Sequence, residues 1–157
     1  MLRKLLIAAA LTMPTAGFAA PAPVFLHHAI QGNFSEVTLG RVIQNRAASA
    51  QVRSFGAMLV RDHSNGLAQA QALASRLRLR IPATLKPEAR REEALLRHLR
   101  GRNFDREVRR YMINDHLKDI AEFRAQARNG DRATARYAAA TLPVLQHHLA
   151  TARSIRA

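Results

Sequence analysis

The chain has 157 residues, with 25 Lys and Arg against 11 Asp and Glu, a formal net charge of +14, and neither cysteine nor tryptophan. This length fits one domain, and a composition that is 48% hydrophobic and 23% charged excludes general disorder and collagen-like repeats. The lack of cysteine excludes disulfides, thiolate metal sites, iron–sulfur clusters and cysteine nucleophiles. Any metal ion must therefore be held by imidazole, carboxylate or water ligands.

The N-terminal segment has the pattern of a secretory signal peptide. Residues 1–19 combine a basic start, a short apolar run and small residues before a cleavage position after Ala19. The apolar run is too short to cross a bilayer as a helix. We therefore expect residues 20–157 to form the mature chain, a single domain with a net charge of +12 and no transmembrane span. Export argues against a specific nucleic-acid partner, although the positive charge alone would suggest a polyanion.

The mature part reads as helix throughout, because Ala, Leu, Arg and Gln dominate and no segment alternates in the way of a strand. Long helices are expected at 24–46, 49–78, 104–128 and 132–155, with a short helix at 88–100. The first two helices follow one another closely, as do the last two, so each pair predicts an antiparallel hairpin. The long middle connection can return along the bundle, which is the connectivity of ferritin-like folds. The fold class expected is all-α, a ferritin-like four-helix bundle with an extra short helix between helices 2 and 3.

Each expected long helix places an ionisable residue on its apolar face. At about 100° per residue, the inward positions include Glu36, His63, His116, Asp119 and His148. A buried carboxylate or imidazole costs several kcal/mol unless it is paired or hydrogen-bonded. These five inward residues therefore need a common explanation.

The same residues belong to a wider pattern of glycines, acids, histidines and aromatic residues between Phe25 and Ile155. Its members are Gly32, Asn33, Glu36, Leu39, Gly40, Phe55, Met58, Asp62, His63, Pro82, Leu96, Leu99, Gly101, Phe104, Asp105, Asp115, His116, Phe123, Leu142, Pro143 and His148. In this pattern the chain resembles a bacterial family of domains of unknown function, family 4142. Members of that family are exported, are often labelled predicted outer membrane proteins, and are assigned a ferritin-like bundle. The chain departs from the family pattern at Val108, Arg124 and His147, and Arg124 replaces a possible carboxylate ligand. The resemblance implies the fold and a location in the periplasm, free or peripheral to the outer membrane, but no activity.

Two interpretations of the inward residues stay open. The five inward residues are chemically adequate for one transition-metal ion, iron, zinc, manganese or copper, with Asp62 and Asp115 supporting the ligands rather than binding the metal. The chain nevertheless lacks the Glu-x-x-His motif of di-iron bundles. The alternative is a buried polar network in which carboxylates hydrogen-bond imidazoles. His27 and His28, at the start of the first helix, form a weaker metal candidate because a surface pair is usually solvated.

The basic residues concentrate between Arg76 and Arg110, where 12 Lys or Arg and 5 acids give a local charge of +7. Guanidinium groups bind phosphate and carboxylate well, so this region could contact anionic envelope surfaces such as lipid headgroups or glycolipid. The candidates for this contact are Arg90, Arg91, Arg97, Arg100 and Arg102. The alternative is an ordinary solvated surface.

No nucleophile triad or phosphate-binding loop occurs in the chain. The sequence therefore predicts an exported bundle without enzyme activity, with a structural or binding role in the envelope or its stress response. The alternative is a metal-binding or redox protein that uses the inward cluster.

Overall fold

The computed structural model describes residues 18–156 and is helical throughout its core. Its helices are α1 (Ala22–Arg46), α2 (Ala50–Arg76), α3 (Pro87–His98), α4 (Gly101–Asn129) and α5 (Arg132–Ser154). The described residues contain no strand, so the all-α prediction is confirmed. None of the helices in this part of the chain has an apolar stretch long enough to cross a bilayer. The expected signal peptide lies almost wholly outside the described residues.

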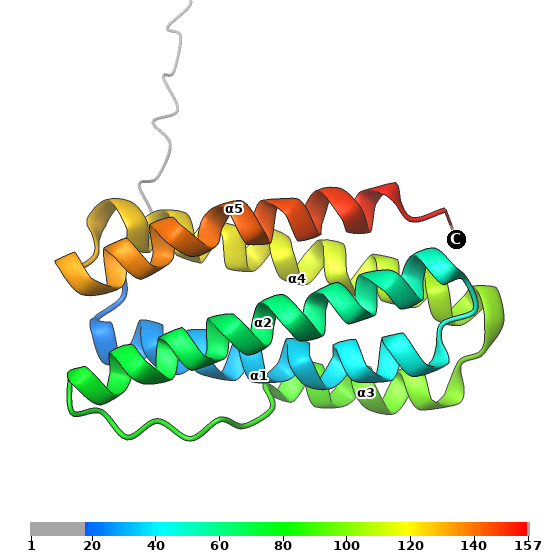
Figure 1. Ribbon diagram of the computed structural model, residues 1–157, viewed down its shortest axis with the longest axis horizontal. Coiled ribbons are helices and arrows are strands. Elements are labelled where there is room, and N and C mark those ends of the chain that lie inside the picture. Colours follow the sequence, from blue (N-terminus) through cyan, green and yellow to red (C-terminus); the bar gives the residue numbers. More distant parts are fainter. Residues whose placement is uncertain (1–17, 157) are drawn as a thin grey trace, which may run out of the picture.

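The helices form two hairpins joined by a long return connection (Figure 1). Helices α1 and α2 pack against each other as one antiparallel pair, and α4 and α5 as the other. After α2, residues 77–86 and α3 lead back toward the α1–α2 turn, so that α2 and α4 run in the same direction (Figure 1). Helix α3 contacts both α1 and α4. The predicted hairpins and the returning connection are thus present.

The helix ends follow from local chemistry. Ser49 caps α2 by accepting a hydrogen bond from the backbone N–H of Val52, as a serine before a helix is expected to do. The buried carboxylate of Asp105 accepts the backbone N–H groups of Ala48 and Ser49 at 2.9 Å each, which ties the α1–α2 turn to the start of α4. Helix α4 begins at Gly101 rather than at 104, and this first residue has a φ of 59°, a left-handed conformation that glycine adopts without a steric penalty.

The interior is divided into two hydrophobic clusters. The first core lies near the α1–α2 turn and is built around residues such as Leu39, Phe55, Phe104 and Met112. The second core lies toward the opposite end of the bundle. Its buried members include Phe25, Ile30, Ala70, Phe123, Tyr137 and Leu145.

Between the two cores lies a polar layer, made of Asn33, Glu36, His63, His116 and His148. All five are buried, with exposed fractions of 6% or less. Along every contributing helix the polar layer falls between residues of the first core and residues of the second core. The fold therefore brings four of the five predicted inward residues, Glu36, His63, His116 and His148, to one height of the bundle.

Candidate metal centre

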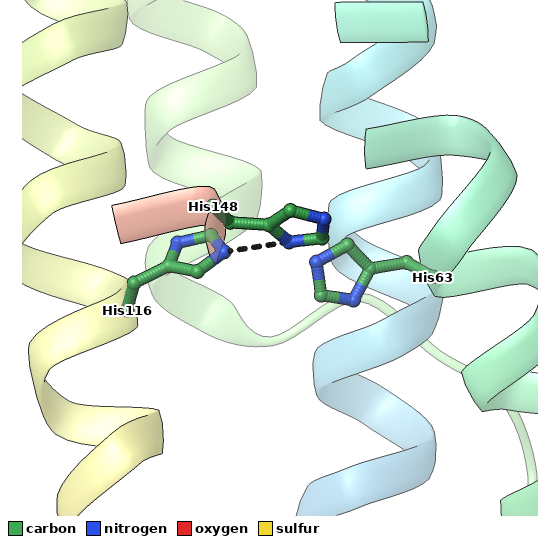
Figure 2. A group of neighbouring side chains, drawn as sticks. All are labelled: His63, His116 and His148. Carbon is green, nitrogen blue, oxygen red and sulfur yellow. Dashed lines mark hydrogen bonds between the residues drawn. The ribbon is translucent and has the colours of Figure 1, made fainter. Parts of the chain in front are cut away.

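Three histidines from three helices meet in the polar layer. His63 comes from α2, His116 from α4 and His148 from α5, and their rings face one another (Figure 2). One nitrogen from each ring lies within 4.8 Å of the other two. Helical spacing explains the direction of the His116 ring, since Met112 and Ile120, one turn to either side, are also buried.

Hydrogen bonds fix which nitrogens of two rings carry the proton. His116 Nδ1 lies 3.0 Å from the carbonyl oxygen of Met112, and a carbonyl can only accept, so Nδ1 is protonated and Nε2 keeps its lone pair. His148 Nε2 lies 3.0 Å from a carboxylate oxygen of Asp62. Nε2 of His148 therefore carries the proton, and in the neutral ring Nδ1 keeps its lone pair.

The third ring is fixed by an asparagine. The Asn33 amide nitrogen donates to the Ala29 carbonyl at 2.7 Å and to the Tyr137 hydroxyl at 3.3 Å, so its oxygen is the atom 3.0 Å from His63 Nδ1. His63 Nδ1 is thus the protonated nitrogen, and Nε2 keeps its lone pair. Gly66 makes this contact possible, because a Cβ there would lie 2.4 Å from the Asn33 amide oxygen.

The inward lone pairs create an electrostatic conflict that a cation would relieve. His116 Nε2 and His148 Nδ1 lie 3.3 Å apart, and two neutral rings would set lone pair against lone pair. Burial lowers the pKa of His116 to about 4 and that of His63 well below its usual value. Burial also lowers the pKa of His148, although Asp62 opposes this shift. A second proton on either ring, or a metal ion, would satisfy both nitrogens.

The spacing of one pair of these nitrogens matches metal coordination. Zinc–imidazole bonds of about 2.0 to 2.1 Å in a tetrahedral site place neighbouring ligand nitrogens about 3.3 to 3.4 Å apart. The 3.3 Å between His116 and His148 has this value already. The ligand nitrogen of His63 lies within 4.8 Å of the other two, so it would have to move closer to complete a three-imidazole site.

Glu36 supplies a carboxyl group beside the histidines. Its Oε2 lies 4.0 Å from His63 Nε2, and among the described residues neither atom has a hydrogen-bond partner. Burial, reinforced by Asp115 and Asp119, raises the pKa of Glu36 well above its usual value, so this contact joins two neutral groups and is not an ion pair. Each such buried, unsatisfied atom costs about 1 to 3 kcal/mol. A ligand between the two atoms would remove that cost.

A lysine neutralises the acids next to Glu36. The Lys86 ammonium lies 3.4 Å from Asp119 Oδ1, and its backbone N–H donates to the Ser35 hydroxyl at 2.9 Å. Burial acts to lower the pKa of Lys86, but Asp119, Asp115 and Glu36 outweigh it and raise the pKa. Burial and Asp115 raise the pKa of Asp119 to about 6. The acids therefore form a separate charged group with Lys86 beside the imidazoles.

Comparison with known families now places the chain. A family model described as a domain of unknown function, DUF4142, matches residues 8–155. The chain belongs to the DUF4142 family. No curated protein matches it, and neither does any solved structure. The family resemblance seen in the sequence is confirmed.

Of the five inward residues, the structure brings the three histidines together and sets Glu36 next to them. Asp119 is turned toward Lys86 instead, so it is not part of the imidazole group. Asp62 forms a hydrogen bond with His148, whereas Asp115 acts on Glu36 and Lys86. Metal binding by this set stays a prediction.

Two functional residues were missed in the sequence. Lys86 lies in the connection before α3, where helical periodicity gives no direction for a side chain. The chain is rich in arginine and has only two other lysines, Lys4 and Lys118, so the choice of lysine at position 86 could have drawn attention to it. Asn33 belongs to the family pattern, but its contact with His63 depends on the approach of α1 to Gly66 of α2, which periodicity does not give.

The basic region lies on the surface. Arg90, Arg91, Arg97, Arg100 and Arg102 are all exposed. Arg97 pairs with Glu93 at 2.7 Å. Exposure is expected both for anion binding and for a solvated surface, so contact with envelope lipids or glycolipid also stays a prediction.

Proposed function

We propose that this DUF4142 protein binds one transition-metal ion through His63, His116 and His148, with Glu36 as the fourth ligand. The observation that carries the proposal is the fixed direction of three lone pairs. Each imidazole donates its other N–H to a held acceptor: the carboxylate of Asp62, a backbone carbonyl or an asparagine oxygen. Ligating histidines in metalloproteins are oriented in this way.

The donor set favours the later transition metals. Imidazole nitrogens suit zinc, copper and iron, whereas manganese prefers sites rich in oxygen, and affinity at such sites rises toward copper. Three imidazoles and one carboxyl group fit the four-coordinate geometry of zinc. Zinc or copper is therefore the ion expected at this site.

We also propose that the bundle is ferritin-like and that it works in the periplasm, free or peripheral to the outer membrane. The two hairpins and the returning connection (Figure 1) support the fold assignment. The signal-peptide pattern of residues 1–19 supports export. The sequence left two alternatives, an envelope protein with a structural or binding role and a metal-binding or redox protein. A metal-binding role in the envelope would combine them.

The test is elemental analysis of the protein, without a histidine tag, purified from the compartment to which it is exported. We expect about one zinc or copper ion per chain, either as purified or after refilling of the chelator-treated protein. Fewer than about 0.1 ions per chain, before and after refilling with zinc, copper and iron, would rule the site out.

Matched variants connect the metal to the site. His147 and His148 are neighbours on α5, but His147 is exposed and His148 is buried. We expect His148→Ala to lose the ion and His147→Ala to keep it, with circular dichroism showing that both remain helical. If His148→Ala does not fold, His63→Ala provides the same comparison. Equal metal content in folded variants of both kinds would contradict the proposal.

A further inference from the structure

A narrow cavity reaches from the surface of the bundle to His63. It lies between α1, α4 and α5, and its lining includes His28, Glu122, Asp119 and His63. The side chains of His28 and Glu122 are 49% and 32% exposed, those of Asp119 and His63 only 13% and 6%. Side-chain exposure thus decreases along the cavity, from His28 and Glu122 at the surface to His63 in the polar layer.

The outer end of this cavity carries metal-ligand chemistry. His28 Nδ1 lies 2.9 Å from a carboxylate oxygen of Glu122, and imidazole with carboxylate is a donor pair suited to zinc or copper. Helical spacing continues the lining inward, since Gly32 is one turn after His28 on α1 and Asp119 is one turn before Glu122 on α4.

The dimensions suit a cation that has shed most of its water. The cavity has a volume of about 10 Å³, which is about the space of a single water molecule. An ion moving through it has to exchange hydration for protein ligands. The Lys86 ammonium lies 3.4 Å from one carboxylate oxygen of Asp119. An incoming cation is repelled by this positive charge where it passes Asp119, so a binding site nearer the surface would be needed to hold it first.

We infer that His28 and Glu122 form a capture site through which the metal ion reaches His63, His116 and His148. This inference rests on the proposed metal binding and adds the path of loading. The two residues bind the ion transiently, and the cavity then passes it inward beside Asp119. Because the capture site is a step on the path, it changes the rates of binding and release without changing the final affinity.

The test measures the rate of zinc uptake by the full, chelator-treated protein, using stopped-flow competition with a chromophoric chelator. In the double variant His28→Ala and Glu122→Gln we expect the association rate to fall at least tenfold. We expect the dissociation rate to fall by the same factor, so that the Kd stays within about twofold of the parent value.

The control is His27→Ala, because His27 is the exposed neighbour of His28 and does not line the cavity. It is expected to load at the parent rate. Circular dichroism checks folding, and the single variant Glu122→Gln replaces the double variant if the latter is unfolded. Parent-like rates in the folded variant, or a higher Kd with an unchanged association rate, would overturn the capture site. Failure of the parent protein to bind zinc at all would instead overturn the proposed function.

Discussion

Replacing Asp62 by alanine tests how the tautomer of His148 controls the site. Asp62 accepts the Nε2–H of His148 at 3.0 Å and so directs the Nδ1 lone pair inward. Without this carboxylate the proton can move to Nδ1 and form a hydrogen bond to His116 Nε2, 3.3 Å away, which removes both atoms as ligands. Loss of such a supporting partner weakens metal affinity by about 10- to 100-fold, or about 1.4 to 2.7 kcal/mol.

The effect can be read as ligand-induced stability. At free zinc 100 times the parent Kd, the parent gains about 2.7 kcal/mol on binding. At the same zinc concentration Asp62→Ala should gain only about 0.4 to 1.4 kcal/mol. Urea denaturation with and without zinc measures both values.

Arg61→Ala is the control for this experiment, because it removes the other partner of Asp62 and leaves His148 untouched. Arg61 is 72% exposed, and a surface pair of this kind contributes at most about 1 kcal/mol. The reasoning fails if Asp62→Ala keeps the parent response to zinc, or if Arg61→Ala loses as much of it.

Two further substitutions test the packing around the polar layer and the pH dependence of the fold. Gly66→Ala should destabilise the apo protein by about 1 to 3 kcal/mol in urea denaturation, because the new Cβ would lie 2.4 Å from the Asn33 amide oxygen. Alanine has a higher helix propensity than glycine, so a variant that is more stable than the parent would contradict this account of Gly66. Burial and the neighbouring Glu107 raise the pKa of Glu92 to about 7, so the folded state favours the protonated acid, and this contribution is present below about pH 4.5 and lost as the pH rises toward 7. Between pH 4.5 and 7.5 the unfolding free energy of Glu92→Gln should therefore fall by about 2 to 3 kcal/mol less than that of the parent. If the variant loses as much stability over this pH range as the parent does, Glu92 is not the source of the pH dependence.

The helices and the inward residues could be predicted because both depend on periodicity. A residue such as His116, with Met112 and Ile120 one turn away, has its direction set by its own helix. The hairpins followed from the short breaks near Ser49 and Asp131, whose side chains cap the following helices. These features are local, so the sequence was sufficient to predict them.

The composition of the site depended on contacts between elements, which periodicity does not supply. Asp119 has the helical phase of a ligand, but the connection before α3 places the Lys86 ammonium beside it. The tautomer of His63 depends on Asn33, whose approach requires Gly66 on the neighbouring helix. Helical phase therefore gave the candidates, and the packing between helices decided which of them meet.

The positions of the three histidines along the chain give the site a second consequence. His63 belongs to the first hairpin, and His116 and His148 belong to the second, so an ion held by all three would cross-link the two halves of the protein. In chain-entropy terms, a link closing the roughly 50 residues from His63 to His116 stabilises a fold by about 4 kcal/mol. Disulfides supply such links in many proteins, and this chain has no cysteine. A metal ion in the polar layer would act as a reversible cross-link between the two hairpins.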